Sequence, residues 1–145
     1  MSVKNFFTTQ EKEDITIAIK NAELDTSGEI RVHIEETCRG DARDRAAYIF
    51  DKLNMQKTEQ RNGVLFYLAL KNRKFSILGD AGINSVVPEN FWDDIRDIML
   101  DHFRENNFVD GLVEGITMAG QQLKKHFPYQ MDDVNELSDE ISFGK

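Results

Sequence analysis

The chain contains very little cysteine and proline, and it has no long apolar run. Of its 145 residues one is cysteine, Cys38, and two are proline. A single thiol cannot form an internal disulfide, so nothing argues for an oxidising compartment. The longest apolar run, residues 64–70, is far shorter than the roughly 20 residues that span a bilayer, and residues 1–14 lack the apolar core of a signal peptide. We therefore expect a cytoplasmic protein without a membrane span.

Positive charge is also scarce. The chain has 18 Lys and Arg residues against 26 Asp and Glu residues, which gives a formal net charge of -8. Sequence-independent binding to nucleic acid needs cations that neutralise phosphate, so we expect no nucleic-acid partner. A chain of 145 residues with 40% hydrophobic content fits one compact, soluble domain with its own core.

The common catalytic motifs are missing as well. The sequence has no GxSxG, P-loop, GxGxxG or HExxH motif, so no organic cofactor is expected, and its three histidines lack zinc spacing. Cys38 lies between a strand and a helix, where a cysteine phosphatase holds its nucleophile. The position that would then need arginine is Asp44, whose carboxylate would repel phosphate. The sequence therefore favours a structural role for Cys38.

Hydrophobic periodicity predicts alternating helices and strands. Helices are expected over residues 9–24, 41–53, 88–105 and 109–126, and strands over 29–36, 64–70 and 75–78. The first two strands, joined by a helix, should form a parallel pair, and a short turn at 72–73 should make a hairpin of the last two. The pattern predicts an α/β fold. Its form is a three-layer α/β/α sandwich with a small mixed central sheet, a parallel strand pair plus a hairpin, and about four main helices.

The chain divides into a single domain over residues 1–127 and an acidic C-terminal tail over residues 128–145. Pro128 closes the last predicted helix. The residues after it are rich in Asp and Glu and have few large apolar side chains. We expect this tail to lie on the surface or to be disordered.

Polar side chains are expected to gather at one edge of the sheet. The first two strands begin at Glu29 and Gly63, and the third runs back and ends at Asp80. Arg61 and Asn62 directly precede the second strand, so they should reach the same edge. Two carboxylates, an amide and a guanidinium could hold a divalent cation and an anionic group together. The same side chains could equally form a surface salt-bridge cluster, and Asp80 could simply bond its own turn.

Short motifs in a fixed order resemble those of the TPM domain family. They lie at residues 27–32, 44–50, 61–65, 73–77 and 79–83, followed by Phe108, Gly111-Leu112 and Gly115. The resemblance covers roughly residues 9–127. It implies an α/β/α sandwich, an acid-phosphatase activity and a divalent cation, calcium first, at an acidic loop edge. Many members have Gly-Tyr-Gly-type residues where this chain has residues 79–82.

Two functions remain open at this stage. The first is metal-assisted phosphomonoester hydrolysis, with Asp80 and Arg61 as catalytic residues and with Asp80, Glu29 and Asn62 as ligands of calcium or magnesium. The second is a non-catalytic, calcium-binding interaction module for an unknown protein partner associated with a membrane. Catalysis needs an open metal position, whereas a closed ligand shell favours a structural role.

Overall fold

The computed structural model describes residues 3–24, 26–129 and 137–144 of the chain. Its helices are α1 (Val3–Phe6), α2 (Thr9–Glu23), α3 (Ala42–Lys52), α4 (Ala81–Asn84), α5 (Asp93–Arg104) and α6 (Phe108–His126), with a 3-10 turn η1 (Met55–Lys57). Its strands are β1 (Glu29–Glu35), β2 (Gly63–Ala69), β3 (Lys74–Gly79) and β4 (Ser142–Phe143).

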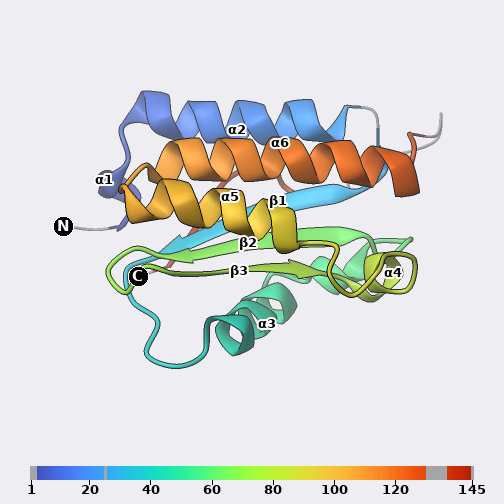
Figure 1. Ribbon diagram of the computed structural model, residues 1–145, viewed down its shortest axis with the longest axis horizontal. Helices are drawn as coiled ribbons and strands as arrows, with labels where there is room; N and C mark the ends of the chain where they lie inside the picture. Colours follow the sequence, from blue (N-terminus) through green and yellow to red (C-terminus); the bar gives the residue numbers. More distant parts are fainter. Residues whose placement is uncertain (1–2, 25, 130–136, 145) are drawn as a thin grey trace.

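The strands form one sheet with helices on both faces (Figure 1). Helices α2, α5 and α6 cover one face and α3 covers the other. The strand order is β3-β2-β1-β4, with β1 parallel to β2 and β2 antiparallel to β3. Every residue of β2 is buried, because alternate side chains enter the larger core under α2 and α6 and the smaller core under α3. The predicted α/β/α sandwich is confirmed.

A fourth strand, β4, was not expected from the sequence. It pairs with β1 in parallel through His33 with Ser142 and Ile34 with Phe143, and the Gly144 N–H donates to the Ile34 carbonyl at 2.8 Å. Residues 137–144 of the acidic tail thus lie along the sheet. The other tail residues that carried the sequence argument, at positions 132, 133 and 136, lie outside the described residues. A two-residue strand leaves no periodic signal in a sequence.

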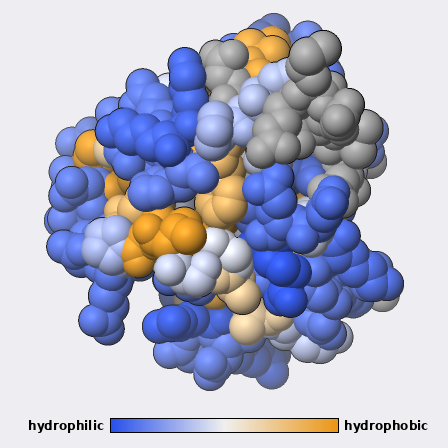
Figure 2. All heavy atoms as spheres, turned by 90° about the vertical axis from the view of Figure 1, so that its right-hand side faces the viewer, coloured by the Kyte–Doolittle hydropathy of each residue, from blue (hydrophilic) through white to orange (hydrophobic). Residues whose placement is uncertain are grey.

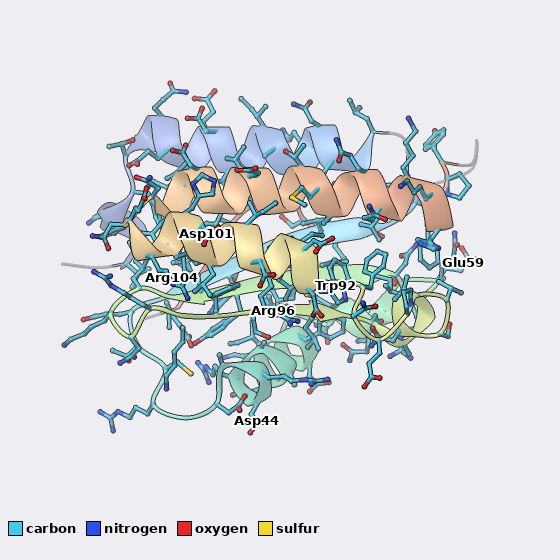
Figure 3. The ribbon with its side chains drawn as sticks, viewed as in Figure 1. Asp44, Glu59, Trp92, Arg96, Asp101 and Arg104 are labelled. Carbon is cyan, nitrogen blue, oxygen red and sulfur yellow. The ribbon has the colours of Figure 1, made fainter. Side chains whose placement is uncertain are left out.

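The third predicted helix begins later than expected. The sequence pattern placed its start at Pro88, whereas α5 begins at Asp93. The Phe91 N–H bonds the Pro88 carbonyl and the Asp93 N–H bonds the Asn90 carbonyl, which is the spacing of turns and not of an α-helix. Trp92, labelled in Figure 3, precedes α5 and is only 7% exposed, so it belongs to the core.

Glycines on α6 allow close contact with α5 and α2. A Cβ added at Gly115 would lie 2.5 Å from the Met99 sulfur. One added at Gly120 would lie 2.6 Å from the Ala22 Cβ and 2.8 Å from its Cα. Met99 is flexible and can move, whereas the Ala22 backbone cannot. Gly120 therefore sets the distance between α2 and α6.

We predict that Gly120→Ala destabilises the protein by about 1–3 kcal/mol, because the overpacking outweighs the gain of about 1 kcal/mol in helix propensity. Urea denaturation followed by circular dichroism measures the change. Gly40→Ala is the control, since an added Cβ there meets no atom within 4 Å. A Gly120→Ala protein as stable as the wild type would contradict this account of the α2–α6 contact.

Candidate functional site

The edge expected from strand directions exists in the structure. Glu29 pairs with Gly63 across β1 and β2, and the Asp80 N–H donates to the Gly63 carbonyl at 2.9 Å. The Asn62 carbonyl accepts from the Glu29 N–H at 3.3 Å. This edge lies on the right in Figure 1 and faces the viewer in Figure 2, where most of the visible surface is hydrophilic with a smaller apolar area in the middle. The topology therefore brings these residues to one side of the sheet.

Both carboxylate oxygens of Asp80 are hydrogen-bonded. Arg61 donates a hydrogen bond to each of them, from Nε to Oδ2 at 2.8 Å and from Nη2 to Oδ1 at 2.8 Å. The Ala81 N–H also donates to Oδ1 at 2.7 Å, so Asp80 caps α4. The Asp80 side chain is 5% exposed and that of Arg61 is 49% exposed. Their hydrogen bond raises the pKa of Arg61. Asp80 thus closes its own turn and holds a guanidinium at the surface.

The backbone of the preceding loop positions Arg61. Its φ is 51°, in the left-handed region, and its carbonyl accepts from the Gly82 N–H at 2.9 Å. A Cβ at Gly82 would collide with the carbonyl oxygens of Gln60 and Arg61. Glycine is therefore required where α4 meets this loop, and the contact directs Arg61 toward Asp80.

Glu29 and Asp80 do not meet. Glu29 on β1 and Asp80, directly after β3, flank Gly63 from opposite sides, so their backbones are separated by two strand spacings, or about 10 Å. The space over Gly63 is covered by Met55 and Leu137, which lie 3.3 to 3.6 Å from where a Cβ would be. Glu29 instead accepts a hydrogen bond at 2.5 Å from the Leu137 N–H. Among the described residues no group of three or more His, Cys, Asp or Glu side chains is arranged to hold a metal ion.

A third carboxylate at this edge, Glu23, was not among the candidates from the sequence. Its Oε2 accepts from the Ile30 N–H at 2.8 Å. Burial raises the pKa of Glu23 to about 9, with further contributions from a hydrogen bond to Asp139 and from the charges of Asp139 and Glu29. Carboxylates of α2, β1 and the tail therefore gather where the tail reaches the sheet. Their meeting could not be found in the sequence, because the groups that contact Glu23 come from distant parts of the chain and no local pattern pairs them.

Farther along β1, a buried network of polar side chains forms a hydrogen bond with the tail. His33 contacts the Ser142 hydroxyl through Nδ1 at 2.9 Å and Glu35 through Nε2 at 3.2 Å. Arg45 donates to both oxygens of Glu35, at 2.8 and 3.0 Å, and the Tyr67 hydroxyl donates to it as well. Burial alone would raise the pKa of Glu35, but these hydrogen bonds hold it at about 2. Burial lowers the pKa of His33.

The other candidates from the sequence lie away from this edge. Cys38 is buried, and its thiol donates to the Gly40 carbonyl at 3.5 Å. Asp44 is exposed on α3 and points away from the sheet (Figure 3). No phosphate-binding loop is formed here, in agreement with the structural role expected for Cys38.

The chain matches a known family over most of its length. The family model TPM_phosphatase, described as the TPM domain, matches residues 2–122. The chain therefore belongs to the TPM domain family, as the ordered motifs indicated. None of the curated proteins compared with the chain matches it.

Solved structures share the same architecture. The NMR structure of the BA42 protein from the psychrophilic bacterium Bizionia argentinensis has 46% sequence identity and a TM-score of 0.91, over 98% of each chain. An N-terminal domain of a P. gingivalis protein has 21% identity and a TM-score of 0.67, over 83% of this chain and 78% of that one. The N-terminal domain of cg2496 from Corynebacterium glutamicum has 12% identity and the same TM-score, over 83% and 76%. The latter two show the fold alone.

We predict that Glu23→Gln makes the metal-free protein more stable at alkaline pH. Because the pKa of Glu23 rises from 4.5 to about 9 on folding, the folded state holds the proton more tightly. The stability from this proton is complete below pH 4.5 and is lost as pH rises toward 9. Glutamine needs no proton, so the variant should exceed the wild type by about 2 kcal/mol at pH 8 and by little at pH 5.

Urea denaturation with a chelator at the two pH values tests this prediction. Glu13→Gln, an exposed position on α2, is the matched control for the loss of one charge. Equal pH dependence in the wild type and Glu23→Gln would show that Glu23 does not hold a proton at neutral pH.

Proposed function

We propose that this TPM-domain chain is a non-catalytic binding module that takes up a divalent cation, calcium before magnesium, at the tail-facing edge of the sheet. The observation that carries the proposal is the hydrogen bond between the partly buried Glu23 carboxyl and Asp139, close enough to Glu29 for its charge to act on Glu23. Buried like charges repel one another unless a proton or a cation lies between them. Carboxylate oxygens are the ligands that calcium prefers.

The carboxylates at this edge are of the type that binds calcium. The described ranges contain no group of three ligand side chains already arranged around a metal position. Calcium takes about six to eight oxygen ligands, and backbone carbonyls and water commonly supply several of them. Glu29, expected from the sequence, would be a ligand together with Glu23 and Asp139. Asn62 lines the same edge. Asp80 would stay with Arg61 and keep the neighbouring loop in place.

A cation at this edge would connect the tail to the domain. Glu29 already bonds the backbone of Leu137, and β4 follows a few residues later. Binding would therefore stabilise residues 137–144 against β1 and change the surface that the protein offers to a partner. None of the helices in the described ranges is long and apolar enough to cross a membrane.

Metal-assisted phosphomonoester hydrolysis is the second candidate. It is supported by the name of the family model and by the half-exposed Arg61 guanidinium, which could hold a phosphate group. It is weakened by the hydrogen bonds that occupy both oxygens of Asp80. Catalysis would require Arg61 or Asp80 to leave this pair.

Calorimetric titration of the chelator-treated full chain with calcium and then magnesium tests the first proposal. We expect saturable calcium binding by the wild type and by Glu13→Gln. Glu29→Gln should weaken it by about tenfold or more, because one charged ligand is lost while the bond to Leu137 can persist. Absence of binding at millimolar calcium, or unchanged affinity in Glu29→Gln, would overturn it.

Turnover of a generic phosphomonoester by the same samples separates the two candidates. The binding module predicts equal background rates in the wild type and Asp80→Asn, with circular dichroism confirming that both are folded. Turnover that requires the cation and disappears in Asp80→Asn would make the chain a hydrolase.

A further inference from the structure

A cavity lies at the opposite end of the sheet from the carboxylates. Its volume is about 570 Å³, and its apolar walls come from Val3, Phe6, Leu70 and Phe108. We call it the hairpin pocket, because Leu70 belongs to the connection between β2 and β3. The volume falls within the range of roughly 300–1,000 Å³ that is typical of small-molecule sites.

The position of the hairpin pocket is one that α/β folds use for ligands. Strands β1 and β2 are parallel and both end on this side, at Glu35 and Ala69, on the left in Figure 1. In open α/β sheets, ligands bind outside the carboxyl ends of parallel strands, where the loops diverge. The carboxylate edge described above lies at the opposite, amino ends of the same strands.

Aromatic side chains give the pocket a wall that is partly anchored in the core. Phe108 is 8% exposed and packs against Phe103 with ring centroids 5.7 Å apart. Phe6 lies 6.1 Å from Phe108 in an edge-to-face arrangement, yet it remains 43% exposed. An apolar ligand that covers Phe6 would remove this surface from water, which favours binding.

The rim of the pocket favours an anion. Lys71 and Arg73 line it from the hairpin, and in the part of the chain that the structure describes neither forms an ion pair. Among the lining residues that the structure describes, Glu36 is the one carboxylate, so their net charge is positive in a chain of net charge -8. The neighbouring groove across Phe6 has the opposite character, because it is lined by Glu11, Asp14 and Asp110. An anionic group of a ligand is thus attracted to the hairpin pocket and repelled by the neighbouring groove.

We propose that the hairpin pocket binds a small amphipathic anion, with an aromatic or other apolar body against Phe6 and Phe108 and one carboxylate between Lys71 and Arg73. The apolar contact supplies affinity, and the two cations select the charge of the ligand. This site is independent of the proposed cation edge, so either can exist without the other.

A matched set of three probes tests the charge preference on the chelator-treated full chain. Naphthoate, naphthylmethanol and naphthylmethylamine share one ring system and differ in the charge of a single group. Calorimetry should find naphthoate bound about tenfold more tightly than the neutral alcohol, with the amine weakest. Amide chemical-shift changes should fall on Leu70, Lys71 and Phe108.

Variants then assign the preference to residues. The double variant Lys71→Gln with Arg73→Gln should bind naphthoate no better than the alcohol, whereas Lys20→Gln, an exposed cation on α2, should keep the difference. Phe6→Ala should weaken the binding of naphthoate and of the alcohol equally. Because Phe6 is exposed, this substitution leaves the core intact. Equal affinities for the three probes, a preference that survives the double variant, or no binding at millimolar naphthoate would overturn the proposal.

Discussion

The pairing of β1 and β3 on opposite sides of β2 is the constraint on which both ends of the molecule depend. Because β1 and β2 run in one direction and β3 returns, Glu29 and Asp80 are brought to the edge at Gly63. The same directions place the ends of β1 and β2 and the hairpin at the opposite edge. One end of the sheet thus collects carboxylates, and the other collects apolar side chains with a basic rim. One topology thus gives the two ends of the sheet surfaces of opposite charge.

The polar face of β1 is the second organising feature. A strand in the middle of a sheet normally has apolar faces, yet β1 carries Glu29, Arg31, His33 and Glu35 on one side. Burying a polar group costs free energy unless its hydrogen bonds are made. Arg45 and Tyr67 satisfy Glu35, and Ser142 of the tail satisfies His33. The tail therefore supplies a hydrogen-bond partner that a buried side chain of β1 needs. A cation at Glu29 would act on the same segment of the tail.

Much of the candidate site was accessible from the sequence, because it depends on strand order and direction. Period-two alternation located β1, the apolar run located β2, and the short turn after it implied the return of β3. These three inferences suffice to bring Glu29, Asn62 and Asp80 to one edge. They do not reveal that Arg61 binds both carboxylate oxygens of Asp80. That ion pair depends on the left-handed backbone of Arg61 and on the close contact between Gly82 and the loop that carries Arg61. They also do not reveal Glu23, because its neighbours come from other elements.

The sequence by itself determined the four longer helices apart from the start of α5, the central strands, their order and the family, because caps and hydrophobic periodicity act over a few residues. The capping box of Thr8 with Glu11 and the side-chain cap of α3 by Asp41 are examples of such local signals in the structure. Only the tertiary structure decided where the tail goes and which charges it meets. Leu137 bonds Glu29 across 108 positions, and Ser142 meets His33 across 109. Such contacts depend on packing of the whole chain, and no local pattern encodes them.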